Sequence, residues 1–274
     1  MKVRSNGNLQ GMAQEKENQQ SNIVNFLTTN TYLFKGFTEK DLWEFLPSEG
    51  LIREKLFSNR PVFTAFLPDE SLDGLYIVLE GGPVIVRSNP LDRIISLTYA
   101  GGCFGMRSLN FSFGMATKSF PSLVEAYKTT YVTKIPLDNF IKIYESYSLV
   151  RDRYAKLFEL REKFTYHILN CSSYPPQAVA ALLRALIYQE RELEHQPNRD
   201  GIYILDLSAE VISKACQLNQ RTVEQVLKGM QKEGLIYLDK DNDTSEDVIH
   251  ILNAEALKEV YSATRDKVSW WPLK

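Results

Sequence analysis

Two side chains in the C-terminal third of the sequence have the types and the spacing to hydrogen-bond with the edges of DNA bases. Arg221 and Gln225 are four residues apart, so in a helix they lie one turn apart on the same side. In the major groove an arginine fits the two acceptors of guanine, and a glutamine fits the acceptor and donor of adenine. If this segment is a helix that lies in the major groove, the two side chains would contact neighbouring bases.

Residues 207–236 contain the elements that must position these side chains. Ser208 has the type of a helix N-cap and precedes a short segment with one apolar face, and Asn219 caps a second segment. Gly234 stands where a left-handed residue would end that segment. Two short helices joined by about three residues make a helix-turn-helix. The second has an apolar stripe at helical spacing: Val223, Val226, Leu227 and Met230.

The same stretch resembles the helix-turn-helix of the Crp/Fnr family of bacterial transcription regulators. The resemblance rests on three short runs: Thr222-Val223, Leu227-Lys228 and Glu233-Gly234-Leu235-Ile236. It implies double-stranded DNA as a partner, with phosphates contacted by Ser208, Thr222 and Lys228. It also implies base reading by Gln220, Arg221 and Gln225, behind the cap Asn219. Gln217 replaces the family's turn glycine. We therefore expect a non-glycine residue in the left-handed conformation there, which costs about 1 kcal/mol of conformational energy.

Composition indicates a soluble protein with room for two cores. The chain has 274 residues, of which 44% are hydrophobic and 24% charged. It contains no run of 18 apolar residues and no N-terminal signal peptide, so we expect a cytoplasmic protein without a membrane partner. The net charge of −2 argues against a nonspecific nucleic-acid binder, although specific regulators need no basic excess.

The cysteines do not have the spacing of a metal site. Cys103, Cys171 and Cys216 lie far apart, so we expect no disulfide framework, zinc site, iron–sulfur cluster or other cofactor. Cys103 is either a redox sensor or, as we favour, a buried structural cysteine. An enzyme is not expected, because no nucleophile with a base and no paired carboxylates occur at a usable spacing.

The sequence predicts a sensor domain over 21–136, after a disordered tail at 1–20. Thr38 caps a helix that Pro47 ends, and short apolar runs predict strands at 61–63, 75–81, 84–86 and 124–135. This region resembles a cyclic-nucleotide-binding domain. The implied fold class is α+β: an N-terminal double-stranded β-helix (jelly roll), a long dimerisation helix and a C-terminal winged helix-turn-helix.

The expected pocket of that domain lacks the groups that hold a cyclic nucleotide. Cyclic-nucleotide receptors place a glutamate after Gly105 and an arginine with a hydroxyl residue further on, where this chain has Met106, Phe120 and Pro121. A buried phosphate without a positive partner would carry a penalty of several kcal/mol, so we expect no usual cyclic AMP binding. Either the barrel is filled by its own side chains, or a small metabolite binds. The loop resembles that of the family's 2-oxoglutarate-sensing branch, and the candidate pocket is Phe104, Gly105, Met106, Arg107 and Phe120.

Residues 137–173 contain neither glycine nor proline and are predicted to form one long helix. Its apolar residues recur at alternating spacings of four and three, as in a coiled coil. This predicts a homodimer on a palindromic DNA site; the alternative is that the stripe packs on its own barrel. The predicted interface is Val150, Tyr154, Leu157, Arg161, Phe164 and Ile168.

The DNA-binding domain is predicted at 174–274. Tyr174-Pro175-Pro176 marks a hinge, and a strand at 202–208 leads to the helix-turn-helix. Two strands at 237–238 and 248–251 form a wing around an acidic loop, followed by a helix at 254–261. As a regulator, the protein would have RNA polymerase as a further partner. The acidic wing and near-neutral motif leave a second hypothesis open: a sensory or scaffold protein whose helix-turn-helix mediates protein–protein interaction.

Overall fold

The computed structural model describes residues 6–47, 50–65, 70, 72–89, 93–106, 120–169, 173–239, 248–262 and 268–272. The chain divides into two compact units, Met1–Val86 with Leu97–Phe158 and Arg87–Ser96 with Glu159–Lys274. The division falls inside a helix at Phe158 and not at the predicted hinge, Tyr174.

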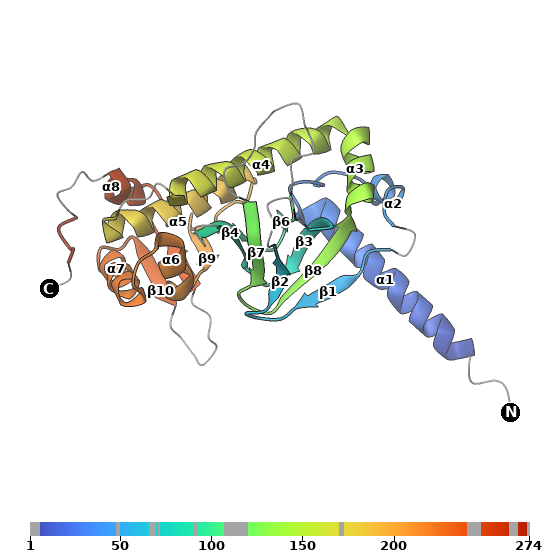
Figure 1. The fold of residues 1–274 in the computed structure, drawn as a ribbon, viewed down its shortest axis with the longest axis horizontal. Helices are drawn as coiled ribbons and strands as arrows, with labels where there is room; N and C mark the ends of the chain where they lie inside the picture. Colours follow the sequence, from blue (N-terminus) through green and yellow to red (C-terminus); the bar gives the residue numbers. More distant parts are fainter. Residues whose placement is uncertain are drawn as a thin grey trace. The chain divides into compact units, whose positions relative to one another are not determined.

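The N-terminal half combines two antiparallel sheets with helices (Figure 1), which confirms the predicted α+β fold class. One sheet has the strand order β1-β8-β3-β6 and the other β2-β7-β4-β5. The strands are β1 (Arg53–Leu56), β2 (Pro61–Thr64), β3 (Gly74–Glu80), β4 (Val84–Asn89), β5 (Arg93–Thr98), β6 (Cys103–Phe104), β7 (Phe120–Ala126) and β8 (Thr130–Pro136). The helices are α1 (Asn6–Asn30), α2 (Glu39–Trp43), α3 (Leu137–Ser146) and α4 (Ser148–Leu169).

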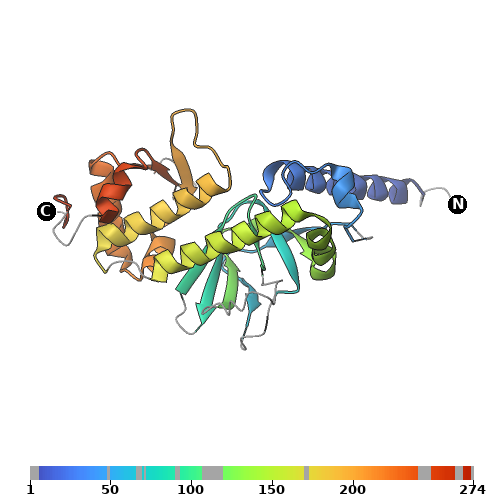
Figure 2. The same cartoon turned by 90° about the horizontal axis from the view of Figure 1, so that it is seen from above.

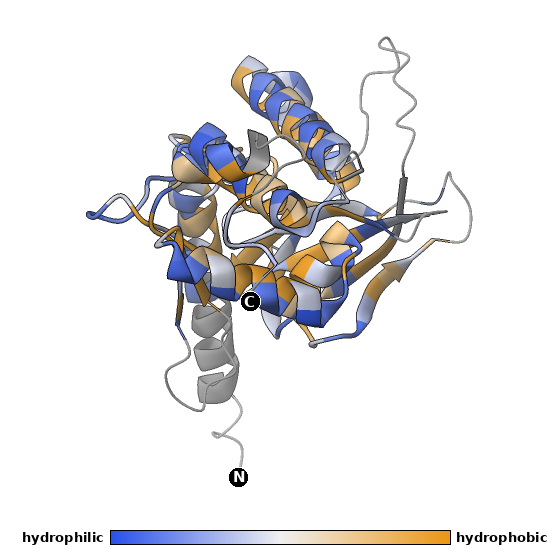
Figure 3. Cartoon of the chain, turned by 90° about the vertical axis from the view of Figure 1, so that its left-hand side faces the viewer, coloured by the Kyte–Doolittle hydropathy of each residue, from blue (hydrophilic) through white to orange (hydrophobic). Residues whose placement is uncertain are grey.

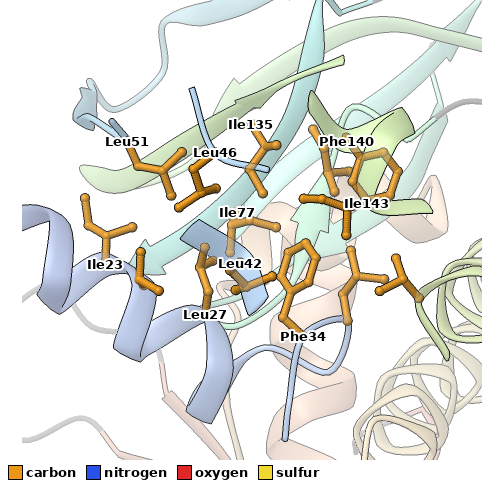
Figure 4. Close-up of a cluster of buried hydrophobic side chains, with 14 of the residues drawn as sticks. Ile23, Leu27, Phe34, Leu42, Leu46, Leu51, Ile77, Ile135, Phe140 and Ile143 are labelled. Carbon is orange, nitrogen blue, oxygen red and sulfur yellow. The ribbon is translucent and has the colours of Figure 1, made fainter. Parts of the chain in front are cut away.

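One face of the β1-β8-β3-β6 sheet is covered by helices (Figure 4). Ile77 and Ile135 from the sheet pack with Leu27, Phe34 and Phe140 from the N-terminal segment and α3, all at most 1% exposed. Each such side chain contributes about 1.5–3 kcal/mol through removal of its apolar surface from water. This cluster is the core of the first unit.

The N-terminal segment differs from its prediction. Helix α1 begins at Asn6, so the expectation of a disordered tail is wrong for residues 6–20. The segment is polar, but residues 6–20 include four glutamines and two glutamates, which are good helix formers, and no proline. Further along the same helix, Ile23, Val24 and Leu27 are buried in the first unit's core. Anchoring at that end stabilises a helix that polarity alone did not predict.

The predicted strand 124–135 is two strands. β7 ends at Ala126 and β8 begins at Thr130, and the two belong to different sheets. The Thr130 hydroxyl donates a 2.8 Å hydrogen bond to the carbonyl of Lys128, and the Tyr127 N–H donates to the carbonyl of Pro83 at 3.0 Å. The chain therefore changes sheets at 127–129, a step that alternation of side chains does not reveal.

The predicted long helix 137–173 is also divided. Tyr147 has an extended backbone (φ −121°, ψ 112°) between α3 and α4. Its ring meets those of Phe37 and Phe45 edge-on, with centroids 4.9 and 5.7 Å away. Arg151 donates to the carbonyl of Glu145 at 2.8 Å, which satisfies the end of α3. Aromatic packing thus breaks a helix whose sequence contains no helix breaker.

The predicted dimer seam on α4 lies largely inside the chain itself. Val150 and Tyr154, at 0% and 5% exposure, belong to the core of the first unit, and Leu157 packs against it. Phe164 and Ile168 are likewise buried, at 3% and 0%, and Arg161 is half-buried. A side chain without exposed surface cannot bury area against a second chain, so Val150 and Tyr154 follow the alternative, in which the stripe packs on its own chain. The dimer itself stays a prediction.

The described residues of the second unit combine an antiparallel sheet with helices (Figures 1 and 2). Strands β9 (Tyr203–Asp206), β10 (Ile236–Asp239) and β11 (Val248–Ile251) form an antiparallel sheet of order β10-β11-β9. The pairing of β10 with β11 is the predicted wing, and β9 adds a third strand to it. The acidic loop at 240–247 lies outside the described residues. Besides the end of α4, the helices are α5 (Pro175–Glu192), α6 (Ala209–Cys216), α7 (Gln220–Lys232) and α8 (Ala256–Ser262).

The helices of the second unit carry both hydrophobic and hydrophilic residues (Figure 3). The hydrophobic side of α5 is its buried side, with Val179, Leu182 and Leu183 at 0% exposure. α8 lies along α5 (Figure 2). Among the described helices, none combines the length and the apolar composition that a membrane span requires.

Two adjacent residues of α4 test the correction to the seam. Val150→Asp places a charge where the chain leaves no exposure, and should lower the free energy of unfolding by more than about 3 kcal/mol. The matched control Leu149→Asp changes a side chain that is 46% exposed, and should stay within about 0.5 kcal/mol of the parent. Urea unfolding measures both. If Val150→Asp produced a stable monomer from a dimer in sedimentation, the seam would face a second chain after all.

Candidate nucleic-acid interface

Two side-chain caps fix the starts of the helix-turn-helix helices. The Ser208 hydroxyl accepts a hydrogen bond from the Val211 N–H at 3.2 Å, at the start of α6. The Asn219 side-chain oxygen accepts from the Arg221 N–H at 2.9 Å, at the start of α7. Both caps were predicted, and both satisfy N–H groups that a helix cannot bond internally.

The turn between the helices contains the predicted left-handed residue. Gln217 has φ 52° and ψ 43°, and its N–H donates to the carbonyl of Ser213. The Leu218 N–H donates to the same carbonyl at 3.0 Å. These two hydrogen bonds offset the strain of a side chain in this conformation, so the turn forms without glycine.

Gly234 ends α7 as predicted. Its φ is 69°, and the Leu235 N–H donates to the Met230 carbonyl at 3.0 Å while the Gly234 N–H donates to the Gln231 carbonyl at 3.0 Å. This pair of bonds is the Schellman motif, and Leu235 supplies the buried hydrophobic contact that accompanies it. The length of α7 is thus set at both ends by local chemistry.

The two sides of α7 differ in exposure as the sequence predicted. The apolar stripe Val223, Val226, Leu227 and Met230 is at most 4% exposed. The opposite side is exposed and polar, and it includes the predicted base-reading residues: Gln220, Arg221, Gln225 and the phosphate candidate Lys228. Thr222 is half-buried at the edge between the two sides.

The cations on this exposed side are available to a ligand. Within the part of the chain that the structure describes, neither Arg221 nor Lys228 has an ion-pair partner, whereas Lys214 on α6 is paired with Glu210 at 2.6 Å. The Gln220 amide donates to the Glu224 carboxylate at 3.1 Å. Two unpaired cations beside amide groups suit phosphates and base edges.

Ser208 differs from the other predicted DNA contacts. It is 2% exposed, and its hydroxyl is occupied by the cap of α6. A buried hydroxyl cannot reach a phosphate in this conformation, so we no longer count its side chain as a phosphate contact. Its role in the interface is to fix the helix that supports α7.

Glu224 lies on the exposed side of α7 and was not among the residues predicted to contact DNA. Glu224 is exposed and bonded to Gln220 from within the group of predicted reading residues. Its position four residues after Gln220 was the signal that could have found it, because side chains at that spacing are neighbours on a helix. A carboxylate in this position suits the amino group of cytosine.

Two of the candidate effector residues, Phe104 and Met106, lie in different surroundings. Phe104 is 3% exposed and stacks on Tyr76 with ring centroids 5.0 Å apart. The two are cross-strand partners, so they share the sheet face opposite to that of Ile77, which packs on the helices. Met106, in contrast, is part of the helix-covered core at 8% exposure. Phe104 and Met106 are therefore buried in two different hydrophobic environments.

A polar group stands beside the stacked pair. The Tyr76 hydroxyl donates to the Asp73 carboxylate at 3.2 Å, and the Lys134 ammonium donates to the same carboxylate. The hydrogen bond from Lys134 lowers the pKa of Asp73, while burial and the charge of Asp73 raise the pKa of Tyr76. The Asp73 carboxylate thus accepts from both neighbours, in a cluster at the protein surface beside the stacked rings.

Glycine is required at Gly105, which lies between Phe104 and Met106. Its φ is +81°, and an added Cβ would lie 2.5 Å from the carbonyl oxygen of Gly74. Arg107 and the side chain of Phe120 lie outside the described residues, so the small-metabolite effector stays a prediction. Cys103 is half-buried beside the first unit's core, and the described residues contain no group of three or more His, Cys, Asp or Glu that could hold a metal.

Comparison with solved structures identifies the fold. FixK2 from Bradyrhizobium japonicum is 16% identical, with a TM-score of 0.56 over 78% of this chain and 98% of that chain. A mutant of CooA from Carboxydothermus hydrogenoformans is 16% identical, with a TM-score of 0.54 over 83% of this chain and 92% of that chain. No family model matches the sequence, and neither does any curated protein. The chain thus has the fold of the Crp/Fnr transcription regulators, as the helix-turn-helix resemblance predicted.

The cap of α7 can be tested by itself. Asn219→Ala removes the acceptor for the Arg221 N–H and should lower the free energy of unfolding by about 1 kcal/mol. Asn219→Ser keeps a capping oxygen and should restore most of that loss. Thermal unfolding followed by circular dichroism measures both variants, and equal stability of the alanine and serine variants would contradict the assigned cap.

Proposed function

We propose that the protein is a sequence-specific DNA-binding transcription regulator that acts as a homodimer and is not controlled by cyclic AMP. The observation that carries the proposal is the exposed side of α7, where Arg221 and Lys228 lack ion-pair partners among the described residues. α7 is the second helix of a capped helix-turn-helix, the element that enters the major groove in such proteins.

The small charge of the motif determines what kind of binding to expect. Residues 207–236 contain four basic and three acidic side chains, which leaves one net positive charge. Phosphate attraction is therefore modest, and discrimination must come from base contacts by Gln220, Arg221 and Gln225. RNA polymerase is a further partner in this proposal, as the target of a regulator bound at a promoter.

The homodimer in this proposal uses the exposed side of α4 and not the buried seam. That side carries Ala155 and the 67% exposed Tyr166, together with an internal salt bridge of 2.6 Å between Glu159 and Lys163. Two-fold symmetry would place two copies of α7 in major grooves about one helical turn of DNA apart. A palindromic target is the consequence.

A second function is favoured by one observation on the same surface. The exposed carboxylate of Glu224 lies among the reading residues and would repel phosphates. A sensory or scaffold protein that uses α7 to bind another protein would show no preference among DNA sequences. The experiment below separates these two functions.

Selection from random duplexes at moderate salt should enrich a palindrome with half-sites roughly 10 base pairs apart. On that sequence, Arg221→Ala should remove about 1–3 kcal/mol of discrimination at one base pair per half-site. Lys228→Ala should instead weaken all sequences alike and reduce the salt dependence by about one unit of slope. Absence of any enriched palindrome would favour the protein-interaction function.

Titration calorimetry measures the affinity of the protein for cyclic AMP and cyclic GMP. Because Phe104 stacks on Tyr76 and Met106 is buried in the helix-covered core, cyclic AMP and cyclic GMP should show no binding tighter than about millimolar. The parent protein at several nucleotide concentrations is sufficient for the measurement, with a cyclic-AMP-binding regulator as the positive control. Micromolar affinity would overturn this part of the proposal.

A further inference from the structure

Gly229 has an unusual environment for a residue inside a helix. It is buried near the C-terminal end of α7, and an added Cβ would lie 2.4 Å from Cε3 and 2.6 Å from Cζ3 of Trp270. Apart from proline, glycine is the poorest helix former, so its presence in a helix interior indicates a close approach that a side chain would block. Here the approaching group is the six-membered ring of the Trp270 indole.

Trp270 belongs to a short ordered segment near the C-terminus. The Trp271 N–H donates to the Val268 carbonyl at 3.1 Å, which closes a turn, and the two indole rings meet edge-on with centroids 6.5 Å apart. The hydroxyl of Tyr174, the N-cap residue of α5, lies against the backbone of Val268. Burial raises the pKa of Tyr174, and the Val268 backbone partly opposes that shift. The segment therefore contacts the start of α5 as well as α7.

The place of Gly229 on α7 relates this contact to DNA reading. Gly229 follows Gln225 by four residues and Lys228 by one. Residues four apart on a helix are neighbours on its surface, so the indole lies at the flank of the exposed side, one turn beyond Gln225. The apolar stripe, with Val223 and Met230 at 0% exposure, packs on the side of α7 opposite to the exposed one.

We propose that residues 268–272 form a brace for α7 and that Trp270 is a positioning residue for base reading, through its contact with Gly229. This inference rests on the proposed DNA-binding function. Without the ring, one flank of α7 loses its support, and the helix can tilt within the groove. Base contacts depend on placement to within a fraction of an ångström, whereas phosphate contacts by a long lysine tolerate small shifts.

A double-mutant cycle tests the packing independently of DNA. In the parent, Gly229→Ala should lower the melting temperature, because its Cβ would overlap the indole. In a Trp270→Ala background the same substitution should raise the melting temperature, because alanine is the better helix former once the ring is absent. Trp270→Phe, with a smaller ring, should give an intermediate effect and serves if Trp270→Ala fails to fold. The same sign in all backgrounds would overturn the brace.

DNA binding tests the positioning role on the enriched palindrome. Trp270→Ala, or Trp270→Phe to a smaller extent, should weaken binding to that sequence about tenfold while leaving affinity for an unrelated duplex unchanged. Trp43→Ala removes an indole of the first unit and should leave both affinities unchanged. Equal losses on both duplexes, or no loss on either, would overturn the positioning role. If the parent enriched no sequence, the proposed function would fail, and the positioning role would fail with it. The effect of Gly229→Ala on the melting temperature, with and without Trp270, would still decide whether the brace exists.

Discussion

The burial of one apolar stripe of α7 is the constraint on which the candidate interface depends. Val223, Val226 and Met230 are fully buried, and this fixes the rotation of the helix about its axis. A rotation by one residue would turn Arg221 inward without a partner, at a penalty of several kcal/mol for an uncompensated charge. Because the Asn219 cap and the Gly234 stop also fix the ends, the polar side of α7 has one orientation, and its side chains face solvent together.

Local signals in the sequence predicted this part of the molecule well, and the reason is physical. A cap, a left-handed turn and a Schellman stop each depend on hydrogen bonds among residues a few positions apart, so Thr38, Asn219, Gln217 and Gly234 could be placed from the sequence. The periodicity of α4 was a different kind of signal. It shows that one side of a helix is buried, but not whether the burying surface belongs to the same chain or to another. For Val150 and Tyr154 the burying surface belongs to the same chain.

Contacts between residues distant in sequence account for the other corrections. Tyr147 leaves the helical conformation where its ring packs edge-on against Phe37 and Phe45. The residues next to it in the sequence include no glycine or proline that would have predicted this break. The sequence shows Met106 and Phe120 at the positions where cyclic-nucleotide receptors have polar anchors, but it does not show the stacking of Phe104 on Tyr76. That contact depends on the pairing of β3 with β6, which joins residues 28 positions apart.

The weak charge of the helix-turn-helix and the buried glycine of α7 have a common explanation in this structure. A motif with one net positive charge gains little from phosphates, so its affinity for one sequence over another depends on how accurately a few side chains are held. A glycine in α7 reduces helix stability, but it allows an aromatic ring to lie directly on the helix backbone. If Trp270 braces α7 as proposed, its ring would restrict the motion of the helix from a second side. A motif that gains little from phosphates would benefit more from that restriction than from the helix propensity that glycine gives up.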